Sequence, residues 1–576
     1  MQLELPGMPH KEYGPKTLFG KEIHKTKFQS TGEDFYASIC RQAAALADNE
    51  PHRKRLKDIY RNQRFLNGGR IQSAIGAPRQ TTPFNCYASG TINDSMEDIM
   101  AKAAEAAQTL RLGGGIGYNF GTLRPRGDII KSLDSKSSGP MSFMGVFDAV
   151  CKTISSAGHR RGAQMGVMPV DHPDIEEFIT SKNNHTDLLN FNISVGVTDE
   201  FMDAVKNDTE FDLRWGGRVY KTIRATYLWD LLLRSTWDWA EPGVLFIDRI
   251  NKKNNLWYCE TIATTNPCAE QPLPPYGACL LGSFNLTKYL KQTEDRDYYF
   301  DYEQFTTDIP VVVRALDNVI DQAVFPLPQQ AEEAKSKRRM GIGVTGLANT
   351  IEALGAPYGS EEGYDMVELW MATLRDGCYE ASIELAKEKG AFPLFDVKML
   401  ESDFAKTLPE HIREDIRKYG IRNSHLLSIA PTGSISISAD NVSSGIEPVF
   451  SLFYDRPYTT FDGTRIERVE DYGMKFLGVR GRTADEVSVF EHVDMLTLVS
   501  SYVDSACSKT CNVGPNVTWD EFKEVYMRAY DGGASGCTTF RINGKRFALL
   551  TAPTEEVVEE GGACYVNPET GVRSCE

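Results

Sequence analysis

Five consecutive residues, Asn266-Pro267-Cys268-Ala269-Glu270, place a thiol between an amide and a carboxylate, and a second thiol, Cys279, follows nine residues after Glu270. Alternate residues of an extended segment share a face, so Asn266, Cys268 and Glu270 would point the same way. The pattern predicts a reactive sulfur beside a hydrogen-bonding amide and a proton-transferring acid.

The sequence around Cys268 does not favour a thiolate, although the thiolate is the form of cysteine that acts as a nucleophile. Glu270 is an anion and opposes a second negative charge, and no Lys, Arg or His stands beside Cys268. Ordinary nucleophilic catalysis is therefore disfavoured, whereas exchange of a hydrogen atom needs no thiolate. The alternative is a buried structural cysteine in a proline-bounded loop, which is the more common fate of a cysteine.

Other cysteines offer redox partners for Cys268. Cys86 could form a trio with Cys268 and Cys279 in which two thiols are oxidised to a disulfide during turnover, although burial alone would explain an isolated Cys86. Cys507 and Cys511 are separated by three residues and are interpreted mainly as core, with a metal or redox role as the alternative.

The last residues of the chain carry Cys564 and Cys575 in a short segment that contains glycine and follows an acidic stretch. An idle thiol is easily oxidised in such a tail, so the two predict a swinging dithiol that exchanges with an internal disulfide. A metal site is the alternative, but neither a Cys-x-x-Cys pair nor a nearby His gives the usual zinc spacing.

A second kind of chemistry is indicated by Pro431-Thr432-Gly433-Ser434, which follows a predicted strand at residues 426–430. A glycine-containing turn with hydroxyl groups presents N–H and O–H donors to a phosphate. The alternative is a plain turn whose hydroxyl groups cap the next helix.

Two further glycine-containing loops have compositions that could suit an anion. Residues 155–164 carry adjacent guanidinium groups, Arg160 and Arg161, which suit phosphate or base contacts unless the loop is a solvated basic turn. Residues 113–117 read Gly-Gly-Gly-Ile-Gly and lack the dinucleotide-binding spacing, so they predict close packing or a tight turn.

Composition limits the classes of function. The 576 residues are 41% hydrophobic and 25% charged, typical of a globular enzyme, and the net charge of -16 argues against nonspecific binding of nucleic acid or an anionic membrane. The N-terminus lacks a secretion signal, and no apolar run approaches the ~20 residues of a membrane helix. We therefore expect a cytosolic, cytoplasmic protein whose twelve cysteines are mostly reduced.

The elements that must position these residues follow an α/β pattern. Helices are predicted at residues 34–49, 95–110 and 361–389, and short apolar runs at residues 341–344, 426–430 and 537–541 predict strands. Their alternation favours mainly parallel strands. Three regions are expected: an N-terminal arm and helical segment at 1–55, with the arm reaching about residue 30; one catalytic domain at 56–550; and a flexible redox tail at 551–576.

Together these motifs resemble the catalytic subunit of ribonucleotide reductases, from about residue 60 to the C-terminus. The resemblance implies a ten-stranded α/β barrel with a central finger loop, on which Cys268 becomes a thiyl radical and removes the 3′ hydrogen of a ribonucleotide. It makes Glu270 the acid/base at the 3′ hydroxyl and Asn266 its hydrogen-bonding companion. Cys86 and Cys279 would supply the reducing equivalents, and the tail cysteines would recharge them.

The resemblance also implies binding sites and partners. The Pro431–Ser434 turn would bind the phosphate of a ribonucleoside di- or triphosphate, and a thioredoxin-like reductant would serve the tail. A deoxynucleotide effector would select the substrate. The implied effector residues are Asp94, Ser95, Met96, Lys131, Arg160 and Arg161. No nucleic acid, membrane or metal is expected, and a homodimer is left open.

The source of the radical distinguishes classes within the family. Residues 430–436 and 441–448 resemble class II members, which depend on adenosylcobalamin. Oxygen-dependent members use a ferritin-like, metal-containing partner and pass the radical through two adjacent tyrosines near the end of the barrel. The corresponding residues here, 534–541, have threonines in place of that pair. The only adjacent tyrosines in the sequence are Tyr298 and Tyr299, far upstream. No glycyl-radical motif is found. The alternatives are the same reaction with such a partner, a nucleotide-binding regulatory protein that has lost catalysis, and a cysteine-rich metal protein.

One further departure concerns regulation. Many relatives carry an ATP-binding module of roughly a hundred residues before the barrel, and too little sequence precedes Cys86 for both. Overall control by ATP and dATP is therefore not expected, whereas control of substrate choice is retained in the prediction.

Overall fold

The computed structural model describes residues 13–78, 81–154, 162–183, 187–460, 463–541, 544–545, 564–566 and 573–575. The predictions for Arg160, Arg161 and the side chains of Cys564 and Cys575 fall outside the described residues.

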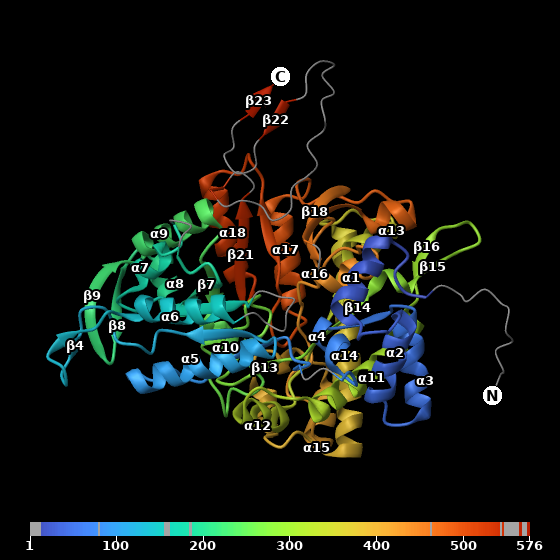
Figure 1. Ribbon diagram of the computed structural model, residues 1–576, viewed down its shortest axis with the longest axis horizontal. Coiled ribbons are helices and arrows are strands. Elements are labelled where there is room, and N and C mark those ends of the chain that lie inside the picture. The colour runs from blue at the N-terminus through green and yellow to red at the C-terminus, as the bar shows by residue number, and fades with distance from the viewer. Residues whose placement is uncertain are drawn as a thin grey trace.

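A mixed sheet of eight strands organises one half of the molecule (Figure 1). Its parallel centre consists of β2 (Cys86–Ala88), β3 (Gly115–Asn119), β6 (Gln164–Pro169), β7 (Phe191–Val197) and β10 (Gly243–Phe246). At one edge β13 (Ala278–Cys279) runs antiparallel to β2. At the other, β21 (Gly536–Arg541) runs antiparallel to β10 and parallel to β20 (Thr510–Val513). The predicted α/β architecture is confirmed, and parallel pairing predominates in this sheet, whereas the two-stranded pairs elsewhere are antiparallel.

A second sheet contains β1 (Phe65–Asn67), β14 (Leu281–Asn285) and β17 (Gly341–Thr345), of which the last two are parallel. Residues 426–430 do not form a full strand; they make isolated parallel bridges from Leu427 to Ile342 and from Ile429 to Cys507. Dense apolar packing surrounds this sheet and the helices α11 (Tyr302–Gln322) and α14 (Glu361–Lys389).

The predicted helices form where their capping residues indicated. Asp34 caps α2 (Phe35–Leu46), Ser95 caps α5 (Met96–Arg111), and α14 ends at Gly390. In each N-cap a side-chain oxygen accepts a backbone N–H that the first turn leaves without a partner.

Residues 18–28, expected to lie in a loose arm, instead form the helix α1 (Leu18–Phe28). Phe19 and Ile23 stand four residues apart and are buried, as is Phe28 at the end of the helix, which gives α1 apolar side chains to pack. The lysines scattered among them obscured that pattern in the sequence.

The other elements connect or cover these sheets. The helices are α3 (Glu50–Arg61), α4 (Gly69–Ala74), α6 (Pro140–Thr153), α7 (Ile175–Thr180), α8 (Asp199–Lys206), α9 (Ala225–Trp239), α10 (Ile247–Lys253), α12 (Pro328–Lys337), α13 (Leu347–Ala353), α15 (Glu410–Tyr419), α16 (Gly433–Ile437), α17 (Val489–Ser500) and α18 (Trp519–Asp531). The two-stranded pairs are β4 (Ile129–Ile130) with β5 (Ser135–Lys136), β8 (Glu210–Trp215) with β9 (Arg218–Arg224), β11 (Thr264–Thr265) with β12 (Pro272–Leu273), β15 (Leu290–Gln292) with β16 (Tyr298–Phe300), β18 (Phe453–Thr460) with β19 (Gly463–Glu470), and β22 (Cys564–Val566) with β23 (Arg573–Cys575). Among the described helices, none is long and apolar enough to cross a membrane.

Candidate active site

Cys268 lies in the loop that joins β11 to β12. The loop is a turn and not the extended segment expected from the sequence: Ala269 has a φ of 64°, and its N–H donates to Asn266 O at 3.0 Å. The strict alternation of faces therefore does not apply, although Cys268 and Glu270 still reach one cavity.

Contacts from separate segments hold this loop. Asn192 of β7 donates from Nδ2 to Pro267 O at 2.8 Å. Glu270 O accepts Ser428 Oγ at 2.8 Å and Ala506 N at 3.0 Å. These hydrogen bonds fix the backbone on both sides of Cys268.

Glycines of β3 allow the loop to approach the sheet. A Cβ added at Gly117 would lie 1.8 Å from Thr265 O, and one at Gly115 would lie 3.1 Å from Cys86 Sγ. The prediction that residues 113–117 serve close packing is thus confirmed, since any side chain at Gly117 would displace the strand that leads to Cys268.

A cavity of about 610 Å³, called the large cavity, gathers most of the predicted catalytic residues. Cys86, Cys268 and Glu270 line it together with the turn Pro431–Ser434. The segments come from three distant parts of the sequence, and two predicted functions, redox chemistry and phosphate binding, meet in one space.

Cys279 lies directly opposite Cys86 in the antiparallel register of β13 and β2. Side chains of such pairs have Cβ atoms about 4.5–5.5 Å apart, so a small adjustment brings two sulfurs within bonding distance. Cys279 is fully buried. Burial raises the pKa of its thiol well above the usual value, and the nearby Glu270 carboxylate and the Cys86 and Cys268 sulfurs act in the same direction. Cys279 is therefore held as a protonated thiol behind Cys86.

Asn266 is fully buried and is not part of the wall of the large cavity. Its Oδ1 accepts Gln271 N at 2.9 Å, which closes the loop. Its Nδ2 is buried and has no hydrogen-bond partner among the described residues. The amide thus stabilises the turn and keeps one donor available.

The predicted phosphate turn has a strained backbone fixed by hydroxyl groups. Thr432 has a φ of 54°, and its Oγ1 accepts Gly445 N at 2.8 Å and lies 3.0 Å from Thr345 Oγ1. Ser434 Oγ instead faces the cavity side and accepts Lys27 Nζ at 3.3 Å. Thr432 therefore shapes the turn, whereas Ser434 presents a group at its surface.

Three cations of the large cavity, Lys27, Arg70 and Arg456, were not predicted from the sequence. They come from α1, α4 and β18. Nothing in their local sequence marks them, because only the tertiary fold brings them to one cavity.

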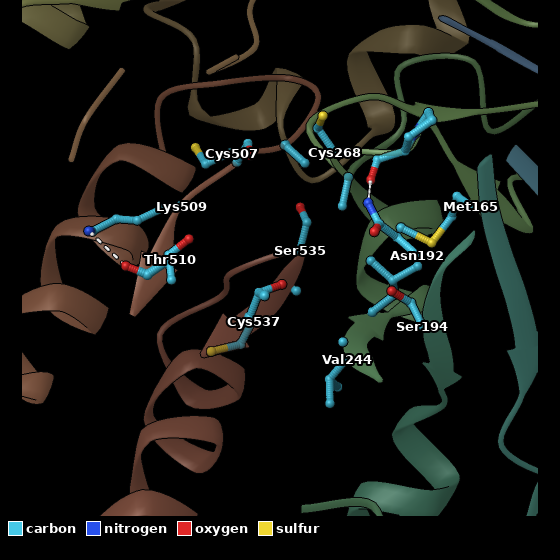
Figure 2. A pocket seen from close by; sticks show the side chains of 18 of the residues that line it. Met165, Asn192, Ser194, Val244, Cys268, Cys507, Lys509, Thr510, Ser535 and Cys537 are labelled. Carbon is cyan, nitrogen blue, oxygen red and sulfur yellow. Dashed lines mark hydrogen bonds between the residues drawn. The ribbon is translucent and has the colours of Figure 1, made fainter. Parts of the chain in front are cut away.

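A second cavity of about 240 Å³, called the small cavity, reaches Cys268 from another side. Figure 2 shows Cys268 at its upper end, with Cys507 and Lys509 on one wall and Asn192 and Met165 on the other. Cys268 and Pro431 line both cavities. Cys268 can therefore be approached from one side while a ligand occupies the other.

Lys509 is the buried cation of the small cavity. Its Nζ contacts Glu447 Oε2 at 2.8 Å, His492 Nδ1 at 3.0 Å and Thr510 O at 3.3 Å. Burial and the neighbouring Lys509 lower the pKa of His492 to about 2, so its imidazole is neutral and can accept from the ammonium. The charge is thus compensated by three acceptors.

The predicted pair Cys507 and Cys511 is divided between two environments. Cys507 lines the small cavity, and burial raises the pKa of its thiol to about 11. Cys511 is buried in β20 beside Cys537. Within the described part of the chain no cluster of three or more His, Cys, Asp or Glu could hold a metal ion.

The predicted effector residues that the structure describes, Asp94, Ser95, Met96 and Lys131, are not part of the wall of either cavity. Asp94 accepts Arg124 N at 3.1 Å and Arg124 Nε at 2.6 Å, while Arg124 also donates to Ile129 O of β4 at 3.2 Å. Ser95 caps α5, Met96 is exposed, and Lys131 is exposed in the turn between β4 and β5. The Arg124 contacts thus bring Asp94 close to the β4–β5 turn.

Comparison with known proteins identifies the family. The model of the ribonucleotide reductase barrel domain matches residues 85–482 and 480–540. The chain belongs to the ribonucleotide reductase family. A vitamin B12-dependent ribonucleoside-diphosphate reductase of Thermoplasma acidophilum is 36% identical over 81% of this chain and 62% of its own length. One of Mycobacterium tuberculosis is 33% identical over 95% of this chain and 81% of its own.

A viral relative is more distant. The ribonucleoside-diphosphate reductase large subunit of Vaccinia virus is 28% identical over 65% of this chain and 53% of its own length. This ribonucleotide reductase chain therefore spans about three fifths of the Thermoplasma relative and four fifths of the mycobacterial one. In this member of the family, two thiols, a carboxylate and the predicted phosphate turn surround one cavity.

Proposed function

We propose that the protein reduces ribonucleotides to 2′-deoxyribonucleotides by a thiyl-radical mechanism. The observation that carries the proposal is the large cavity, in which Cys268, Glu270 and Cys86 face the Pro431–Ser434 turn. A nucleotide whose phosphate lies at the turn would extend its ribose toward the thiols. Membership of the family and the relatives named as ribonucleoside-diphosphate reductases support this assignment.

In the proposed reaction, Cys268 loses a hydrogen atom to become a thiyl radical and removes the 3′ hydrogen of the ribose. Glu270 accepts the proton of the 3′ hydroxyl while the 2′ hydroxyl leaves as water. Cys86 and Cys279 together supply two electrons and two protons, and their sulfurs join as a disulfide. Cys268 then returns the hydrogen atom to C3′ and Glu270 returns the proton to O3′, which restores the thiyl radical and the carboxylate.

The geometry supports these roles in different ways. Cys279 is buried behind Cys86, so the pair is shielded from reductants other than one that reaches Cys86. Asn266 is buried at the start of the loop, where its side-chain amide would hold the turn that carries Glu270. Exclusion of water from such a site limits the side reactions of a radical.

We infer that adenosylcobalamin starts the radical, as the names of the vitamin B12-dependent relatives suggest. When bound, this cofactor supplies a homolysable cobalt–carbon bond and hence a one-electron oxidant for a thiol. The small cavity is below the ~300 Å³ of ordinary ligand pockets, so it can hold only part of so large a group. Its wall, with Asn192, Cys507 and Lys509, would contact that part beside Cys268.

A partner-supplied radical is the competing proposal. The adjacent tyrosines used by such relatives are replaced here by Thr538, which lines the small cavity, and Thr539, whose hydroxyl pairs with Tyr526 at 2.9 Å. The test is deoxynucleotide formation by the purified chain with ribonucleoside diphosphate, a dithiol and adenosylcobalamin. Formation of product would support cobalamin dependence. If no product forms and a ferritin-like partner restores activity, the partner-supplied radical would replace cobalamin dependence.

The closed barrel, the three regions of the chain and the redox tail are also part of the proposal. The isolated bridges at Leu427 and Ile429 lie where they would help to connect the two sheets into the ten-stranded barrel, with residues 266–271 as its finger loop. We propose the three regions 1–55, 56–550 and 551–576 as N-terminal segment, barrel domain and redox tail. The backbone register of β22 and β23 sets Cys564 opposite Cys575, which would suit a dithiol served by a thioredoxin-like reductant.

Substrate selection is proposed for the region of Asp94, Ser95, Met96, Lys131, Arg160 and Arg161, where a deoxynucleotide effector would bind. A groove of small and apolar residues lies between α5, the helix that Ser95 caps, and α6. This groove would suit a second copy of the protein in a homodimer. Titration with each deoxynucleoside triphosphate, read as the change in preference among the four substrates, tests the effector assignment.

A further inference from the structure

The helix α1 lies against the phosphate turn, although the two are about four hundred residues apart in sequence (Figure 1). Asp440, which follows α16, accepts Lys16 N, Thr17 N and Thr17 Oγ1 at 2.8–2.9 Å and so fixes the start of α1. Phe19 and Ile23 pack on Ile437, and Phe28 packs on Ile435. The helix is therefore attached to the turn along its length.

This attachment carries two side chains of α1 to the wall of the large cavity. Thr26 and Lys27 both line it, and Lys27 Nζ donates to Ser434 Oγ at 3.3 Å. The segment lies before residue 85, where the match to the family barrel domain begins. The wall of the cavity at the turn is thus completed by residues outside the matched domain.

A second cation reaches the same cavity from the opposite end of the sequence. Arg456 of β18 lines it, beside Tyr454, whose hydroxyl donates to Asn441 Oδ1 at 2.7 Å. Tyr454 also packs with Phe19 and Ile23, so β18 and α1 share one apolar cluster next to the turn. The two cations therefore belong to one packed unit around Ser434.

We propose that Lys27 and Arg456 bind the terminal phosphate of the substrate and make the cavity selective for nucleotides with at least two phosphates. The inference rests on the proposed function, because it takes the large cavity to be the substrate site. The turn supplies N–H and hydroxyl donors for one phosphate, whereas a further phosphate adds negative charge that these neutral donors do not balance. The ammonium group of Lys27 and the planar guanidinium group of Arg456 balance that charge, and the guanidinium can bond two phosphate oxygens at once.

The test is calorimetric binding of guanosine, GMP and GDP to the full chain without cobalamin or reductant, so that no turnover occurs. The variants are Lys27→Met and Arg456→Met. The matched controls are Lys25→Met, an exposed lysine of the same helix turn, and Arg468→Met on the neighbouring strand β19. Each test variant should weaken GDP binding about 10- to 100-fold, the usual effect of losing a charge-assisted hydrogen bond. Binding of guanosine and of GMP should be unchanged, because neither has a second phosphate. The control variants should bind all three ligands as the wild type does.

Equal weakening of guanosine and GDP would mean that the side chains only shape the wall, and unchanged GDP binding would mean that they do not meet the phosphate; either result overturns the proposal. A wild type that binds no GDP would overturn both this inference and the proposed function. If the expected binding pattern is found but the complete assay yields no deoxynucleotide, the reductase assignment fails, whereas the assignment of Lys27 and Arg456 to the terminal phosphate stands.

Discussion

The two cavities that meet at Cys268 differ in how their polar groups are used. In the wall of the large cavity, buried oxygens of Thr81, Asn85 and Ser283 have no hydrogen-bond partner among the described residues. In the wall of the small cavity, Ser500 Oγ is the single such atom in the described part of the chain. Asn192 donates to the Cys268 loop, and Lys509 has three acceptors.

The difference indicates a division of labour. The large cavity also has three cations and the hydroxyl group of Ser434 in its wall, which favours a polar, anionic ligand. A wall whose donors are already used instead holds its neighbours in place. The large cavity is thus suited to bind a nucleotide, and the small cavity to fix Cys268 and admit a radical source.

The substitution Cys268→Ser should have the largest effect, because it removes the sulfur proposed to carry the radical, at a residue that lines both cavities. Deoxynucleotide formation should fall by ~10⁴-fold or more, as for loss of other residues that carry the chemistry. GDP affinity measured by calorimetry should stay within about twofold, since serine nearly preserves the shape. Cys259→Ser, at an exposed site, is the control. An active Cys268→Ser variant would end the radical assignment, and an active wild type is required for the comparison.

The substitutions Cys86→Ser and Cys279→Ser test the redox pair on the nucleotide side. Without added dithiol, the reduced wild type should stop after about two turnovers, one from the Cys86–Cys279 pair and one from the proposed tail dithiol, and yield a Cys86–Cys279 disulfide, detected by peptide mass spectrometry. Either variant should lose at least ~10²-fold of steady-state activity and form no such disulfide. Cys151→Ser, buried in α6, should behave as the wild type. Full activity in Cys279→Ser would show that another thiol supplies the electrons.

The sequence predicted which residues would come together at the large cavity better than it predicted their backbone geometry. The helix caps at Asp34 and Ser95 act locally, so the starts of both helices were predicted within one residue, whereas α2 ends three residues before its predicted end. The turn at Ala269 was missed because its left-handed backbone is imposed by hydrogen bonds from Asn192 and Ser428, which are remote in sequence.

The cations of the large cavity could not be predicted for a similar reason. Lys27 acquires its place only when α1 packs on α16, and Arg456 only when β18 does. Conversely, the opposition of Cys86 and Cys279 depends on the register of two short strands, which no local pattern specifies. The motif resemblance supplied that pairing, and the strand register provides its geometric basis.

The substitution Glu270→Gln tests proton transfer in the large cavity while preserving side-chain size. Loss of a general base typically costs about 10²- to 10⁴-fold in rate, so kcat should fall by that range with little change in GDP affinity. Glu352→Gln is the matched buried control: burial raises the pKa of Glu352 to about 7, so a neutral amide should be tolerated there. A normal kcat in Glu270→Gln would assign the base to another group.

The substitution Asn192→Ala probes the small cavity alone and should have the smallest effect. It removes the donor to Pro267 O, a hydrogen bond worth about 0.5–1.5 kcal/mol. The loop that carries Cys268 should become less fixed, and kcat should fall by about 3- to 10-fold. GDP affinity should remain unchanged, because Asn192 lines the small cavity and is not part of the large one.

Asn190→Ala is the control, because its amide bonds Asp148 and not the loop. If Asn192→Ala weakens GDP binding as much as it slows turnover, the two cavities are not independent. A loss of kcat at constant GDP affinity would instead separate the two sides of Cys268: binding on one, and support of the radical cysteine on the other.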